Sequence, residues 1–126
     1  AGAGLALAAL VAVAASLSPD ARGWGTHEQL GWSACWFRQR TGRPCPTCGM
    51  TTAWAYAVRG NAQAAVDANF AGVLLLVTAV GAAAWTGATA VAGRWWVVAP
   101  SPRGMLWIAT ACLVATLVDW ARRLAA

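Results

Sequence analysis

Three of the four cysteines stand close together in the sequence and are the residues best suited to chemistry. Nine residues separate Cys35 from Cys45, and two more separate Cys45 from Cys48. A Cys-x-x-Cys pair directs both sulfur atoms toward one point, and thiolates bind soft metals such as zinc. A turn at Thr41-Gly42 folds the intervening residues back, so we expect all three sulfur atoms to lie close together.

A zinc site on these cysteines would need a further ligand. Structural zinc takes four ligands from Cys or His, and His27 is the only histidine of the chain. His27 stands eight residues before Cys35, a spacing that permits a fourth ligand without requiring it. The sequence therefore offers a candidate metal site of Cys35, Cys45 and Cys48, with His27 as the candidate fourth ligand.

Three other interpretations of the cysteines stay open. Cys45 and Cys48 precede a predicted helix, whose N-terminus lowers a thiol pKa, as in redox dithiols. The strand–helix–strand pattern that surrounds such pairs in thioredoxin-like proteins is not recognisable here. A disulfide from Cys35 to Cys45 or Cys48 would suit an oxidising compartment. The simplest interpretation is a compact group of reduced thiols buried among Trp side chains, because free Cys behaves as a small hydrophobe.

The sequence contains no constellation that indicates catalysis beyond this Cys-x-x-Cys pair. It lacks the metalloprotease, phosphate-loop, nucleophile-elbow and dinucleotide motifs. His27 and Glu28 have no second carboxylate or nucleophile near them in sequence, so a solvated loop explains them. Cys112 lies within an apolar stretch and is interpreted as a small buried residue. We therefore expect that the protein is not an enzyme.

The composition is that of a membrane protein. Of 126 residues, 60% are hydrophobic and 10% are charged, against about 45–50% and about 25% in soluble domains. An ordinary soluble enzyme and a disordered tail are excluded. The net charge of +5 comes from scattered Arg residues that form no basic stripe interleaved with aromatics, so nucleic acid is excluded as a partner. We expect a single domain, 1–126, in a lipid bilayer.

Three apolar stretches predict transmembrane helices, since a span needs about 20 apolar residues. They cover residues 1–18, 70–92 and 104–120. The first also contains a small-residue site like that of a secretory signal peptide, but we expect a retained span. At the end of the third, Asp119 faces Arg122 and Arg123 across one helical turn, which predicts an interfacial ion pair.

The segment 19–69 is predicted to carry short interfacial helices. One begins at Met50 and ends at Gly60, and a second, over 62–68, is capped by Asn61 and leads through Asn69 into the next span. The first has one apolar face, formed by Met50, Ala53, Trp54, Ala57 and Val58, with Thr52 on the other side. The predicted fold is all-α, an integral membrane protein with three transmembrane helices and short interfacial helices in its first loop.

The run from Cys35 through Thr41-Gly42 to Cys45-Pro46-Thr47-Cys48-Gly49-Met50-Thr51 resembles a bacterial membrane family, domain of unknown function 2752. The signature of that family is C-P-x-C-G-x-T-R-A. Downstream, the Gly60-Asn61 step and the Ala-rich segment before Asn69 follow the order of the family. Thr52 stands where the family has Arg, and Phe70 where it has Pro. The resemblance implies an architecture and a bacterial inner membrane, but no established chemistry.

Arginines predict the orientation in that membrane. The 19–69 loop holds five and the C-terminal tail two, whereas the 93–103 loop holds two. By the positive-inside rule the long loop and the C-terminus face the cytoplasm. Among the nine Trp residues, Trp95, Trp96 and Trp107 suit one membrane interface and Trp120 the other.

Two features favour association with other membrane protein subunits or with copies of the same chain. Four Trp lie in the long loop, at positions 24, 32, 36 and 54, where they suit a partner or the membrane surface. Ala79, Ala83 and Gly87 recur four residues apart, and small residues allow close helix packing in lipid. The leading expectation is a small accessory subunit of a larger membrane complex. The alternative is a membrane-tethered cysteine module that binds zinc or acts as a redox dithiol.

Overall fold

The computed structural model describes residues 2–95 and 98–126, so Trp96 lies outside the described residues. All regular elements in these residues are helical, as predicted. They are α1 (Gly2–Ser16), the 3₁₀ helix η1 (Thr26–Leu30), α2 (Trp36–Thr41), α3 (Met50–Ala57), α4 (Ala62–Ala92) and α5 (Pro102–Ala125).

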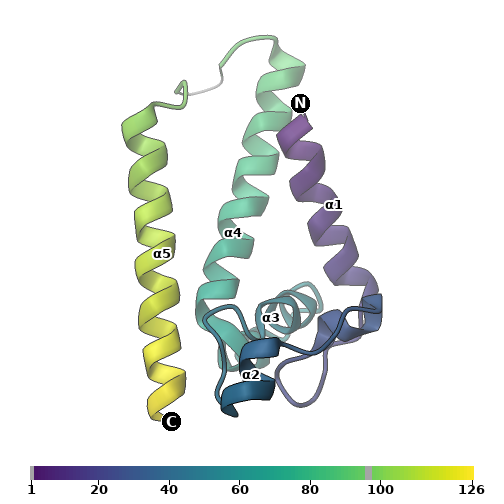
Figure 1. Ribbon diagram of the computed structural model, residues 1–126. Coiled ribbons are helices and arrows are strands. Elements are labelled where there is room, and N and C mark those ends of the chain that lie inside the picture. Colours follow the sequence, from purple (N-terminus) through teal and green to yellow (C-terminus); the bar gives the residue numbers. More distant parts are fainter. Residues whose placement is uncertain (1, 96–97) are drawn as a thin grey trace.

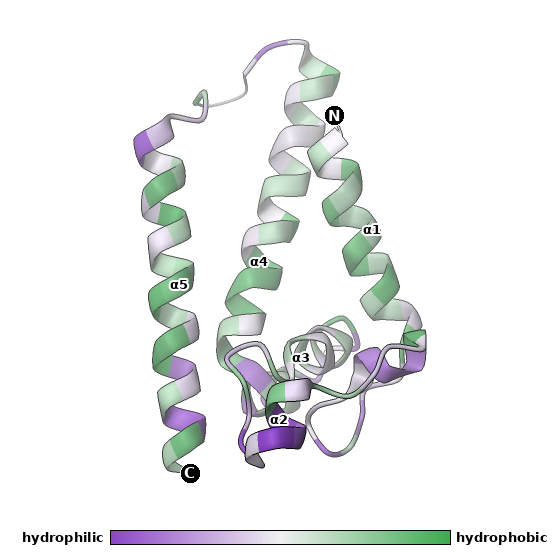
Figure 2. Ribbon diagram, in the orientation of Figure 1, coloured by the Kyte–Doolittle hydropathy of each residue, from purple (hydrophilic) through white to green (hydrophobic). Residues whose placement is uncertain are grey.

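The molecule is elongated, with its short helices gathered at one end. Figure 1 shows α1, α4 and α5 running lengthwise, while η1, α2 and α3 lie where α1 ends and α4 begins. The C-terminus reaches the same end, and the N-terminus lies toward the opposite one. Figure 2 shows that the hydrophilic residues concentrate at the end with the short helices. The long loop and the C-terminal tail therefore share one end, as the three-span prediction requires.

Two helices are long and apolar enough to cross a membrane, namely α4 with 31 residues and α5 with 24. They contain the predicted spans 70–92 and 104–120. The third, α1, is apolar but has only 15 residues, which at about 1.5 Å each reach about 22 Å, short of a hydrocarbon core of about 30 Å. The structure is thus compatible with membrane insertion, with two candidate spans and one shorter apolar helix.

The predicted break before the second span is present as a kink in α4. Asn69 has a non-helical backbone, with φ −167° and ψ 100°, between the Ala-rich turns and the apolar turns. Its buried side-chain oxygen accepts a hydrogen bond from the backbone N–H of Gly72 at 2.7 Å. This is how an N-cap starts a helix, so Asn69 begins the apolar part of α4. Asn61 caps the first part, accepting from Ala64 at 3.2 Å.

Helix α3 is packed inside the loop end, against α4, α1 and η1. Ala53 and Ala55 are fully buried, and such small side chains let the helices approach closely. Thr52, predicted on the face away from the apolar one, is also fully buried. Its hydroxyl shares a 2.7 Å hydrogen bond with Thr26 of η1. That partner, 26 residues away, is what makes burial of a hydroxyl tolerable.

Trp120, predicted at a membrane interface, joins α5 to the loop. Its indole N–H donates to the carbonyl of Pro44 at 2.7 Å, and its ring meets Phe37 edge to face with centroids 6.5 Å apart. At the other end of the molecule Trp95 packs against Trp85 at 5.6 Å. Trp107 is 74% exposed on α5, as a lipid-facing or interfacial ring would be.

Candidate functional site

The structure brings the three predicted cysteines together. The sulfur atoms of Cys35, Cys45 and Cys48 all lie within 4.8 Å of one another, and each is a free thiol. Two sulfur atoms bound to one tetrahedral zinc lie about 3.8 Å apart, since each zinc–sulfur bond is about 2.3 Å. A contraction of about 1 Å or less would therefore place all three on a single ion. Cys112 lies apart from this group, on α5.

The turn predicted at Thr41-Gly42 is what folds Cys35 back onto the other two cysteines. Gly42 ends α2 with a positive φ of 68°, and its N–H donates to the carbonyl of Arg38 at 2.9 Å. The hydroxyl of Thr41 accepts from the backbone N–H of Arg43 at 3.2 Å. The chain then reverses toward Cys45, so α2 acts as a short spacer between the two cysteine-bearing segments.

The Cys45–Cys48 turn is wedged between two other segments. The N–H of Cys48 donates to the carbonyl of Cys45 at 3.2 Å, and Gly49 follows with φ +82°. A β-carbon at Gly49 would lie 2.6 Å from the carbonyl oxygen of Ala68 and 2.7 Å from that of Gly23. Only glycine fits there, because it tolerates positive φ and has no side chain.

Two side chains from distant helices hold the carbonyls of this turn. Asn69 at the α4 kink donates to the carbonyl of Cys48 at 3.1 Å. Arg123 near the end of α5 donates to the carbonyls of Cys48 and Pro46 at 2.9 and 2.8 Å. We call Asn69 and Arg123 the carbonyl clamp. Sequence reasoning missed both roles, because each contact joins residues more than 20 positions apart.

The predicted ion pair at the end of α5 is present and supports the clamp. Asp119 has no exposed side-chain surface and pairs with Arg122 and Arg123, each at 2.8 Å. The side chain of Arg122 is 52% exposed, whereas that of Arg123 is 11% exposed. A buried carboxylate needs such partners, since burying an unpaired charge is costly. Asp119 therefore holds Arg123 in the direction of the cysteine turn.

The thiols of the Cys-x-x-Cys pair differ in acidity. Burial alone would raise the pKa of Cys45, but hydrogen bonds with Thr47, Cys48 and Cys35 bring that pKa below its ordinary value. Burial, reinforced by the adjacent Cys45, raises the pKa of Cys48 to about 12. The Thr47 hydroxyl lies 3.3 Å from the Cys45 sulfur. Cys45 is thus the more readily ionised thiol, and Cys48 the deeper one.

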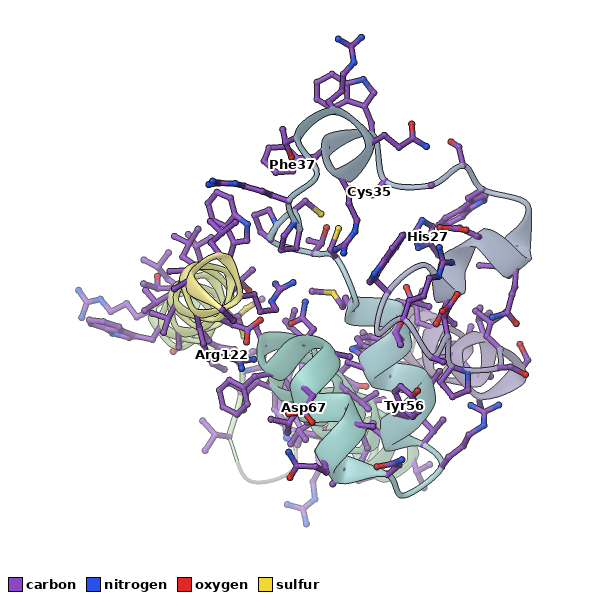
Figure 3. The ribbon with its side chains drawn as sticks, turned by 90° about the horizontal axis from the view of Figure 1, so that it is seen from below. His27, Cys35, Phe37, Tyr56, Asp67 and Arg122 are labelled. Atoms are coloured by element: carbon purple, nitrogen blue, oxygen red, sulfur yellow. The ribbon has the colours of Figure 1, made fainter. Side chains whose placement is uncertain are left out.

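A cavity of about 330 Å³ lies beside the three cysteines. Its wall includes all three cysteines together with Trp24, His27 and Trp32. His27 faces this cavity but is not among the donor atoms that lie within 4.8 Å of one another. Figure 3 looks onto this end of the molecule and shows Cys35 and His27 on the side away from Tyr56 and Asp67.

Trp24 is held between two guanidinium groups. The guanidinium carbons of Arg22 and Arg38 lie 4.1 and 4.0 Å from its ring centroid, a cation–π arrangement. Arg22 is fixed in turn by Asp20 at 2.7 Å and Glu28 at 3.3 Å. This loop Trp therefore forms a fixed, positively flanked wall beside the cysteines, which the sequence pattern did not indicate.

Comparison with known proteins places these features in a family. Residues 35–83 match the family model described as "Protein of unknown function (DUF2752)". These residues carry the domain of unknown function 2752. The matched segment contains the three clustered cysteines, α3 and the kink at Asn69. No curated protein and no solved structure matches the chain.

The family match confirms the resemblance stated from the cysteine run. It carries no assigned activity, so function must be argued from the site itself. Thr52 lies buried against Thr26 at 2.7 Å and takes no part in the thiol cluster.

Proposed function

We propose that the protein is a membrane-tethered cysteine module that holds a soft metal ion, zinc foremost, on Cys35, Cys45 and Cys48. The observation that carries this proposal is the mutual approach of three thiols, within 4.8 Å, from two segments joined by a folded spacer. Soft thiolate donors select Zn²⁺, Cu⁺ or iron–sulfur clusters over harder cations. The donor set present therefore fits zinc.

The surroundings of the thiols support a metal over simple burial. A hydrophobic cluster needs no fixed backbone, yet here the turn carbonyls are held by Asn69 and Arg123. Outer hydrogen bonds of this kind orient metal ligands. The three cysteines also line an open cavity of about 330 Å³, whereas inert thiols are normally enclosed. A divalent cation would offset the charge of three adjacent thiolates.

Elemental analysis with thiol counting tests this function. We expect the protein, purified in mild detergent under reducing conditions and supplied with zinc, to contain one zinc per chain. When the metal-loaded protein is denatured, Cys112 should react readily with a thiol reagent. The three clustered cysteines should react only slowly until a chelator is added. Cys45→Ser should abolish metal retention, and Cys112→Ser should leave it unchanged. Zinc-free protein from zinc-supplied preparations would refute the proposal.

A redox dithiol is the second candidate, favoured by the contact of Cys45 with Cys48. Cys45 is half-buried beside the Thr47 hydroxyl, and Cys48 is buried beside it. Oxidation of both thiols to a disulfide would pass two electrons and two protons to an acceptor disulfide. Titration in glutathione buffers separates the candidates. A Cys45–Cys48 disulfide that forms reversibly, in protein that holds no metal, would favour the redox function.

We also propose that the protein associates with a larger membrane assembly. We place it in a bacterial inner membrane with the long loop on the cytoplasmic side. The support for this association is the apolar surface left open on α4 and α5, such as Val77 and Leu113, which are 65% and 59% exposed. On α4 the backbone of Ala83 lies against Gly4 of α1, whereas Gly87 has open space around it. Gly87→Leu should then disrupt assembly without preventing insertion, since Leu raises hydrophobicity. Unchanged assembly in native gels would contradict this part.

A further inference from the structure

The wall of the cavity beside the cysteines includes Cys35, Cys45 and Cys48 together. We infer that a metal on Cys35, Cys45 and Cys48 keeps one coordination position open to this cavity, and that this position binds a small aromatic thiol from outside the chain. The inference rests on the metal-binding function proposed above and adds to it an exchangeable ligand.

The count of donors leaves the fourth position open. Zinc is four-coordinate, and sites with three protein ligands keep the fourth for an external molecule, whereas structural sites are closed by four. Among the described residues, the group of close donor atoms ends at three cysteines. His27 lies in the cavity wall instead, where it can contact a bound ligand. The cavity therefore lies where the fourth ligand would be.

The walls of the cavity indicate the class of ligand. Trp32 and Met50 contribute aromatic and thioether surfaces to the cavity wall, which pack well against a flat ring. Arg38 lies 4.0 Å from the Trp24 ring centroid and favours an anionic group nearby, whereas Arg22 is already paired with Asp20 and Glu28. A soft metal prefers a sulfur donor. These three requirements meet in an aromatic thiolate.

A second cavity provides room for an apolar substituent on that ligand. It measures about 180 Å³ and shares His27, Trp32, Met50 and Thr51 with the first. From there it reaches Leu10 and Ala14 of α1, one of the apolar helices. A ligand with its sulfur on the metal could therefore extend its apolar part toward the membrane-side end of this surface.

The binding step is a ligand exchange without oxidation or reduction. The metal–water bond breaks, the thiol loses its proton to the solvent, and a fourth metal–sulfur bond forms. The water leaves to the solvent, and the metal and all sulfur atoms keep their oxidation states. Because the proton is released, ligand binding should strengthen as pH rises toward the pKa of the added thiol.

Cobalt-substituted full-length protein in detergent provides the test, with thiophenol as the probe. Co²⁺ replaces zinc in thiolate sites and has visible bands that report coordination number and ligand type. We expect thiophenol to intensify the sulfur-to-cobalt charge-transfer band from the level of three Co–S bonds toward that of four. Thr51→Phe should fill the shared part of both cavities and weaken thiophenol binding at least tenfold while keeping cobalt. Thr51→Ser is the matched control and should bind thiophenol normally.

His27→Ala separates an open position from a closed one. We expect its cobalt spectrum before thiophenol to equal that of the unaltered protein. A loss of nitrogen-ligand character or of cobalt affinity in this variant would show that His27 closes the site, and would overturn the inference while leaving metal binding intact. An unaltered spectrum on adding thiophenol would overturn it too. Failure of cobalt and zinc to bind at all would remove the proposed function itself.

Discussion

At the scale of single residues, the cluster depends on what each cysteine touches rather than on its identity alone. Cys45 and Cys48 are three positions apart, yet hydrogen bonds lower the pKa of one and burial raises the pKa of the other. The Thr47 hydroxyl at 3.3 Å from the Cys45 sulfur is part of this difference. Thiolates, not thiols, are the reactive and metal-binding species, so the two residues should behave differently in solution.

Alkylation of the metal-free protein measures this difference. Near pH 8 we expect iodoacetamide to modify Cys45 before Cys48, because the lowered pKa of Cys45 leaves more of it ionised. The pKa of Cys48, about 12, keeps it protonated until the solution is strongly alkaline. Peptide mass spectrometry after timed quenching gives both rates. Earlier modification of Cys48 would contradict the assigned environments.

Gly49 is the residue on which the cysteine turn most directly depends. Gly49→Ala should destabilise the fold by about 2–5 kcal/mol, from about 1–2 kcal/mol for positive φ and about 1–3 kcal/mol for steric overlap. The overlap arises with carbonyl oxygens at 2.6 and 2.7 Å. Unfolding in detergent measures the loss.

Gly60 offers a matched control for that substitution. It has a similar positive φ of 78° but open space where a β-carbon would lie. Gly60→Ala should therefore cost only the backbone part, about 1–2 kcal/mol. Equal losses at both glycines would mean that the close approach of the Gly49 turn to Ala68 and Gly23 does not exist.

At the scale of elements, the ends of two long helices support the cysteine turn. The kink of α4 contributes Asn69, and the last turns of α5 contribute Arg123, whose side chain is aligned by the buried Asp119. The apolar helices and the cysteine loop are therefore one structural unit. A change at the end of α5 should therefore alter the position of the Cys48 turn, 75 residues earlier in the sequence.

Arg123→Ala tests this support. Loss of the guanidinium removes its hydrogen bonds to the carbonyls of Pro46 and Cys48 and leaves only those from Asn69. Removing an outer partner typically lowers metal affinity by about 10–100-fold. Arg122→Ala is the control, because Arg122 pairs with the same Asp119 but is half-exposed. Competition with a zinc chelator gives both affinities. Similar affinities for the two variants would show that the carbonyl clamp does not matter to the site.

Local patterns predicted the long apolar helices and α3 but neither η1 nor α2, and the long-range contacts escaped them. Hydropathy located the apolar helices, Asn61 and Asn69 marked the two parts of α4, and the Thr41-Gly42 turn predicted the gathering of the cysteines. Burial of Thr52 depends on Thr26, and the role of Trp120 depends on Pro44, 76 residues away. Neither partner can be identified from spacing. Of the predicted span 1–18, Gly2–Ser16 is helical, and Ala1 lies outside the described residues.

At the scale of the whole molecule, hydrophilic residues concentrate at the end that carries the short helices (Figure 2). Loop and C-terminal tail together hold seven of the nine Arg. Hydropathy and the two long helices suit a bilayer, and the arrangement places the cysteine cluster at the arginine-rich end. A metal bound there would lie beside the membrane surface rather than within the hydrocarbon core.

Labelling in intact cells tests the predicted orientation. By the positive-inside rule, Cys35 and Cys45 face the cytoplasm and should resist a membrane-impermeant maleimide until the cells are opened. A Cys112→Ser background restricts labelling to the cluster, and a chelator that crosses membranes removes protection by metal. Rapid labelling of unopened cells would place the loop outside and contradict the predicted orientation.

The most direct test of the central claim is zinc X-ray absorption on the purified, zinc-loaded protein. A metal shared by Cys35, Cys45 and Cys48 predicts one zinc per chain with a shell of three sulfur atoms at about 2.3 Å. The sulfur shell should decrease in Cys35→Ser, the variant whose cysteine lies outside the Cys-x-x-Cys pair. A zinc shell made only of nitrogen and oxygen, or protein that takes up no zinc, would contradict the account.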